Sequence, residues 1–115
     1  MYSPTKKDLV AINRETGETG AFANESSLDF AISLLKHKKA WLHELSYLAR
    51  SLLVDHAFQD GNKRTALALI LTYFDYHQVP CDKQKTVYTV HLIAKKNIKD
   101  INKIMRLIEN GIIRR

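Results

Sequence analysis

The chain has 115 residues, of which 45% are hydrophobic and 26% charged, and its formal net charge is +6. This length predicts one domain, residues 1–115, with enough apolar surface for a core that needs no disulfide. The single cysteine, Cys81, excludes an intrachain disulfide, and no stretch approaches the roughly 18 apolar residues of a membrane span. We therefore expect a cytoplasmic protein without a membrane-spanning segment.

Two helices separated by a polar loop are predicted in the first third of the chain. Thr5 and Asp8 form a capping pair at the start of a helix over residues 5–14. Residues 15–26 contain glycine, serine, threonine and asparagine, which is typical of a loop. A serine at the end of this loop, at position 26 or 27, is expected to cap a second helix that continues to about residue 38.

The clearest helical pattern begins at Trp41 and carries apolar residues at steps of three and four as far as Leu52. The next step of four reaches His56, which places this histidine on the inward face at the end of the helix. A fourth helical pattern follows Gly61 and ends before Pro80. Two consecutive helices with a short turn between them predict a packed helical pair.

The last part of the chain predicts two more helices. Residues 79–81 are expected to be briefly extended, and residues 82–96 form the fifth helix. Asn97 together with Asp100 suggests the cap of a sixth helix, which stops at Gly111. No convincing pair of strands is present. The predicted fold class is therefore all-α, a compact bundle of about six helices with the active-site loop between two core helices.

The positive charge leaves several partners open, among them nucleic acid, an acidic protein and a polyphosphate ligand. No aromatic residues alternate with the basic clusters, and no zinc-finger spacing occurs, so binding to nucleic acid is the less favoured interpretation. Solvated helix faces and chain ends explain the clusters more simply. The basic clusters are Lys36, Lys38 and Lys39; Lys95, Lys96 and Lys99; and Arg114 and Arg115.

The segment HAFQDGNKRTAL, between the third and fourth predicted helices, has the character of an anion site. A helix that begins near Asn62 leaves its first amide groups unpaired, and its dipole favours negative charge there. Gly61 can adopt a positive φ and let a phosphate approach the backbone. Lys63 and Arg64 add two cations, of which the guanidinium suits bidentate contact with phosphate.

The same segment also predicts a metal ion and a general base. A carboxylate beside a phosphate requires a bridging cation, so Asp60 with phosphate oxygens predicts Mg²⁺. A histidine can accept the proton of a hydroxyl group near neutral pH, which suits His56 as a general base. Phe58 is expected to point into the core and fix the turn.

The order of these residues resembles the signature of the Fic/Doc family, His-x-Phe-x-Asp/Glu-Gly-Asn-Gly/Lys-Arg. The segment is most similar to the Doc (death-on-curing) branch, in which lysine follows asparagine and the motif ends Arg-Thr-Ala-Leu, as it does here from Lys63 to Leu67. This resemblance implies transfer of the terminal phosphate of ATP to a hydroxyl group of a protein, with elongation factor Tu as the family's known example.

The resemblance also implies a role for each residue of the motif. ATP and Mg²⁺ are the implied cofactors, and Phe58 supports the motif structurally. The implied roles are those of general base for His56, Mg²⁺ ligand for Asp60, phosphate cradle for Gly61 and Asn62, and neutralisation of the phosphate for Lys63 and Arg64.

Departures from the Fic pattern leave two alternatives beside phosphotransfer. Fic adenylyltransferases, which transfer AMP, carry glycine at the position of Lys63 and a second arginine at that of Leu67. These two differences favour phosphotransfer over transfer of AMP. Family members also carry a flap before the catalytic helix that aligns the target, and only residues 38–41 separate the two helices here. A short or absent flap leaves open a non-catalytic interaction module with the same fold.

The expected partners follow from a further comparison with the family. Some Fic proteins restrain themselves through a Ser/Thr-x-x-x-Glu-Gly/Asn helix. Glu109 and Asn110 fit its last two positions, but Met105 stands where a serine or threonine is needed. Intrinsic inhibition by this helix is therefore not expected, and a separate antitoxin becomes the expected partner besides the protein substrate.

Overall fold

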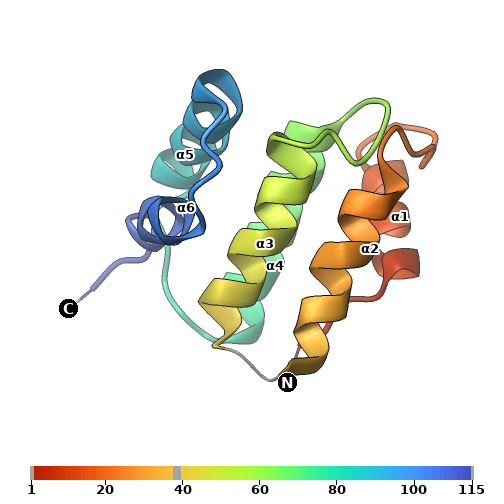
Figure 1. The fold of residues 1–115 in the computed structure, drawn as a ribbon. Helices are drawn as coiled ribbons and strands as arrows, with labels where there is room; N and C mark the ends of the chain where they lie inside the picture. Colours follow the sequence, from red (N-terminus) through yellow and green to blue (C-terminus); the bar gives the residue numbers. More distant parts are fainter. Residues whose placement is uncertain (1, 38–39, 115) are drawn as a thin grey trace.

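The fold is built around two antiparallel central helices, α3 and α4, as Figure 1 shows in a computed structural model that describes residues 2–37 and 40–114. Helices α1 and α2 lie on one side of this pair, and α5 and α6 lie on the other. The α-helices are α1 (Lys6–Glu15), α2 (Glu25–Ser33), α3 (Trp41–Leu53), α4 (Asn62–Tyr76), α5 (Lys83–Lys96) and α6 (Ile101–Glu109), and a 3-10 turn, η1 (Leu34–His37), follows α2.

The predicted all-α class is confirmed over the described residues. Pairing of the β type occurs there only as two isolated bridges, between Phe22 and Phe58 and between Cys81 and Ile112. The second bridge includes one end of the segment expected to be briefly extended, residues 79–81. Within the described ranges, no helix has both the length and the apolar character needed to cross a membrane.

The cap at the start of α1 is the one that the sequence predicts, whereas the caps of α2 and α6 differ from the prediction. Thr5 and Asp8 form the predicted capping box, with N–O distances of 2.9 and 3.1 Å. The cap of α2 is Asn24 instead of a serine, because its side chain accepts the amide three residues later. Asn97 ends α5 in a left-handed conformation, and Asp100 alone caps α6.

The core lies where the two central helices face each other. Apolar side chains at steps of three and four along each helix are withdrawn from solvent, as the sequence pattern predicted. Burial of such side chains is the main stabilising contribution to a fold of this kind. The apolar residues of the two central helices with 0% exposure are Leu45, Leu48, Ala49 and Leu52 on α3 and Ala66, Leu69, Ile70 and Tyr73 on α4.

A polar cluster is buried at the end of the central pair that lies away from the α3–α4 turn. The side chain of Glu44 is only 1% exposed, and neither carboxylate oxygen has a hydrogen-bond partner among the described residues. The Tyr73 hydroxyl and His77 Nε2 are also buried without a partner there. Burial raises the pKa of Glu44, and burial together with the nearby Glu44 carboxylate raises the pKa of Tyr73.

Glu44→Gln is expected to stabilise the fold at alkaline pH. Because burial raises the pKa of Glu44 in the folded state above its ordinary value of 4.5, the folded protein binds more protons than the unfolded chain. The free energy of unfolding therefore falls as the pH rises through the interval between the two pKa values. At pH 8 the variant should be more stable by about 1–3 kcal/mol, measured by urea denaturation.

At pH 4 the variant and the wild type should differ little, since Glu44 is then largely protonated in both states. Glu15→Gln, at an exposed position of α1, is the matched control and should leave the pH dependence unchanged. A Glu44→Gln variant that loses stability at pH 8 would contradict this account.

Candidate active site

The turn between α3 and α4 holds the motif and begins earlier than the sequence predicted. Helix α3 ends at Leu53, so His56 lies beyond the helix and not on its inward stripe. The amides of Val54 and Asp55 both donate to the Arg50 carbonyl, which closes the helix and turns the chain. His56 then takes a left-handed φ of 53° and is exposed. The apolar spacing continues one step beyond the end of the helix. The predicted inward position of His56 is therefore wrong, and the residue is exposed to solvent.

The side chain of Asn62 closes the turn on itself. Its carbonyl oxygen Oδ1 accepts the Phe58 amide at 3.0 Å, and its Nδ2 donates to the Phe58 carbonyl at 2.8 Å. Both polar atoms of this side chain are therefore engaged, which leaves the backbone N–H of Asn62 for the predicted contact with phosphate. Phe58 is 1% exposed, which confirms that it points into the core.

A second segment runs beside the motif and pairs with it. The amides of Ala23 and Asn24 donate to the Ala57 carbonyl at 2.9 and 3.0 Å, and the Gln59 amide donates to the Ala21 carbonyl at 2.9 Å. The Phe22 ring stacks on Phe58 at 5.0 Å.

This pairing places a structured segment at the motif in a part of the chain predicted only as a loop. The stretch in which the sequence predicts a short or absent flap, residues 38–41, includes Lys38 and Lys39, which belong to the first lysine cluster and lie outside the described residues. The segment that the structure places beside the motif is residues 21–24.

The start of α4 has the features of the predicted anion site. Gly61 precedes the helix with φ of 76°, and no side chain caps the first turn. A Cβ at this position would lie 2.5 Å from Cγ of Glu18, so both the backbone conformation and the space require glycine. Unpaired amides of a helix N-terminus favour an anion.

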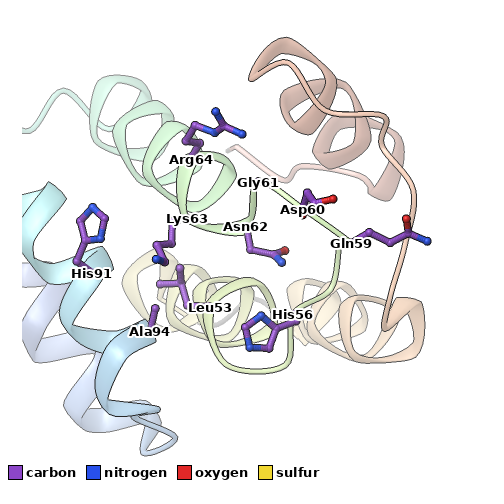
Figure 2. A pocket seen from close by; sticks show the side chains of 10 residues that line it. All are labelled: Leu53, His56, Gln59, Asp60, Gly61, Asn62, Lys63, Arg64, His91 and Ala94. Atoms are coloured by element: carbon purple, nitrogen blue, oxygen red, sulfur yellow. The ribbon is translucent and has the colours of Figure 1, made fainter.

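All six residues predicted to carry the chemistry line one cleft of about 410 Å³, shown in Figure 2. Each of them comes from the α3–α4 turn or the first turn of α4. Residues of α3 and α5 complete the walls. The lining residues are Leu53, His56, Gln59, Asp60, Gly61, Asn62, Lys63, Arg64, His91 and Ala94.

The two cations of the motif project from different sides of α4. In Figure 2 Lys63 points towards α5, whereas Arg64 points away from it. The Arg64 guanidinium forms an ion pair with the carboxylate of Glu18, from the loop after α1. Lys63 is exposed and forms no ion pair among the described residues. A phosphate would therefore find Lys63 unoccupied and would compete with Glu18 for Arg64.

The residues present fit a magnesium ion only together with a ligand. Asp60 is the one carboxylate among the residues that line the cleft. No group of three or more His, Cys, Asp or Glu side chains in the described ranges could hold a metal. Mg²⁺ in proteins is commonly held by one or two carboxylates plus substrate phosphates and water, so Asp60 suits this kind of site.

The sequence interpretation missed the wall that α5 contributes. His91 is exposed, and it lines the cleft together with Ala94. No local pattern connects α5 with the motif, because the contact arises only when α5 packs on α4.

A family model described as the Fic/DOC family matches residues 5–74, more than half of the chain. The chain belongs to the Fic/DOC family. The match contains α1, α2, α3 and most of α4, and it includes every motif residue that lines the cleft. Searches of curated proteins and of solved structures gave no significant match. In this Fic/DOC protein the α5 wall of the cleft lies outside the matched range.

Glu18→Gln is expected to tighten the binding of ATP to this Fic/DOC protein. Removing the carboxylate charge leaves Arg64 available to phosphate, and an exposed ion pair contributes about 0.2–1 kcal/mol. Affinity should therefore rise up to about fivefold, measured by isothermal titration calorimetry. Glu15→Gln is the control, since Glu15 is exposed and forms no ion pair among the described residues. Weaker binding by Glu18→Gln would show that the pair supports the site instead.

Proposed function

We propose that this Fic/DOC protein transfers a phosphate from Mg-ATP to a hydroxyl group of a protein. The observation that carries the proposal is the convergence of six motif residues on one cleft, at a helix N-terminus without a side-chain cap. Phosphoryl transfer requires mainly positioning and neutralisation of charge, which such a site can supply.

Each part of the cleft has a distinct role in the proposed reaction. The acceptor hydroxyl forms a bond to the terminal phosphorus of ATP, the bond from that phosphorus to the bridging oxygen breaks, and ADP leaves. His56 takes the proton of the hydroxyl group; its exposed position at the mouth of the turn suits contact with a macromolecular acceptor. Lys63, Arg64 and the first amides of α4 neutralise the phosphate oxygens.

Asp60 would hold Mg²⁺, which when bound neutralises and orients the phosphate oxygens of the nucleotide. Asp60 is exposed, and its backbone carbonyl is held by a hydrogen bond of 2.9 Å from Asn13 Nδ2. The carboxylate therefore stands on an anchored backbone, and its oxygens form no hydrogen bond or ion pair with the residues that the structure describes.

The residues at two positions favour transfer of the terminal phosphate over transfer of AMP. Lys63 adds a cation where Fic adenylyltransferases carry glycine. Leu67 stands where they carry a second arginine, and it lines a small groove between α4 and α5 whose other lining residues are Lys63, Arg64, Val87, Val90 and His91. Leucine at this position supplies no second guanidinium that would hold further phosphate oxygens.

We further propose that the protein acts in the cytoplasm as a toxin on a translation component, with elongation factor Tu as the first candidate, and that a separate antitoxin restrains it. The restraining helix of some Fic proteins has no counterpart here, because Met105 replaces its serine or threonine. The glutamate at its next-to-last position, Glu109, pairs with Arg114.

ATP labelled on the γ or the α phosphate distinguishes the two reactions when incubated with the protein and a cell lysate. Transfer of the terminal phosphate predicts label on protein from γ-labelled ATP alone. Label from α-labelled ATP alone would show transfer of AMP. Absence of both labels, with purified elongation factor Tu as well, would support the non-catalytic interaction module.

His56→Ala is expected to lower the rate of labelling roughly 100- to 10,000-fold, the usual contribution of a general base. Because His56 is exposed and outside the helices, the variant should stay folded, with a small loss of stability from alanine in the left-handed conformation. His43→Ala on α3, which does not line the cleft, is the control and should label normally. Equal rates for His56→Ala and the wild type would reject His56 as the base.

A further inference from the structure

A single buried side chain on α1 joins three parts of the candidate site. Asn13 is 1% exposed, and its Nδ2 donates to the Asp60 carbonyl at 2.9 Å and to Thr65 Oγ1 at 3.1 Å. Its Oδ1 accepts the Gly20 amide at 2.9 Å. One carboxamide therefore holds the motif turn, the first turn of α4 and the loop that precedes residues 21–24.

The backbone of the same residue holds the start of that loop. The Asn13 carbonyl accepts the Thr16 hydroxyl at 2.6 Å and the Glu18 amide at 3.3 Å. These contacts set the course of the chain that carries the Glu18 carboxylate over Gly61 to Arg64. Asn13 is thus connected to two charged parts of the site. Its side chain contacts the backbone of Asp60, and its backbone contacts the loop whose Glu18 pairs with Arg64.

The geometry points to Asn13 as a positioning residue that sets the place of Asp60 and hence the affinity of the site for Mg²⁺ in the presence of ATP. This inference rests on the proposed function, in which Asp60 holds that ion. Asp60 is itself exposed and its carboxylate has no partner among the described residues, so the hydrogen bond to its backbone carbonyl is what fixes its place there. Asn13 donates to the carbonyl of that backbone from a fully buried position.

The side chain of asparagine suits the three hydrogen bonds that Asn13 forms. A carboxamide presents two donors and an acceptor on one short side chain, and Asn13 uses all three here. Aspartate would lack the donors and would face the Asp60 carbonyl with a like partial charge. Leucine would fill the space but would leave the Asp60 carbonyl and the Gly20 amide without their buried partner.

The test compares Asn13→Leu with Leu9→Ala. Leu9 lies one turn earlier on α1, is fully buried and has an apolar side chain, so Leu9→Ala lowers stability without removing a side-chain hydrogen bond to the motif. The Mg²⁺ concentration for half-maximal binding of ATP should rise about three- to tenfold in Asn13→Leu, the range of one net hydrogen bond. It should stay unchanged in Leu9→Ala, with both variants measured below their melting temperatures.

Amide hydrogen exchange over residues 56–65 gives a second measurement that needs no nucleotide. Exchange in this segment should be faster in Asn13→Leu than in Leu9→Ala at equal global stability. Asn13→Ala is the substitute if Asn13→Leu does not fold. Unchanged dependence on Mg²⁺ in a folded Asn13 variant would overturn the inference alone, whereas a wild type without Mg²⁺-dependent binding of ATP would overturn the proposed function as well.

Discussion

The candidate site depends on the carboxamide of Asn62, which binds both backbone groups of Phe58. These two hydrogen bonds close the turn between the central helices into a fixed shape. Within that turn both His56 and Gly61 take a left-handed conformation, which is readily available to glycine but unfavourable for histidine. The closed turn keeps both in place and directs the imidazole and the start of α4 to one cleft.

Two further contacts hold this turn against the rest of the molecule. The Phe22–Phe58 stack and the pairing of residues 21–24 fix its outer side, and the Asn13 carboxamide fixes its inner side. The motif therefore does not act as an autonomous loop. Its geometry belongs jointly to α1, the segment before α2 and the first turn of α4, which explains why a short signature needs a larger fold around it.

The contiguous part of the site could be predicted from the sequence, because spacing along a turn and the start of a helix are local properties. Gly61 and Phe58 behave as their residue types indicated. The predicted position of His56 was wrong because periodicity indicates which face of a helix is buried but not the residue at which the helix ends. Asn13 and His91 could not be found, since each reaches the motif only through tertiary packing, and an asparagine or histidine on a helix gives no local signal of that contact.

The walls of the cleft come from two separate stretches of chain. The wall with His56, Asp60, Lys63 and Arg64 lies inside residues 5–74, whereas His91 and Ala94 belong to α5, beyond the matched range. The motif residues and the opposing wall therefore come from different stretches of the chain. Exchange of α5 surface residues offers a way to alter which ligand the cleft accepts while every group of the motif is retained.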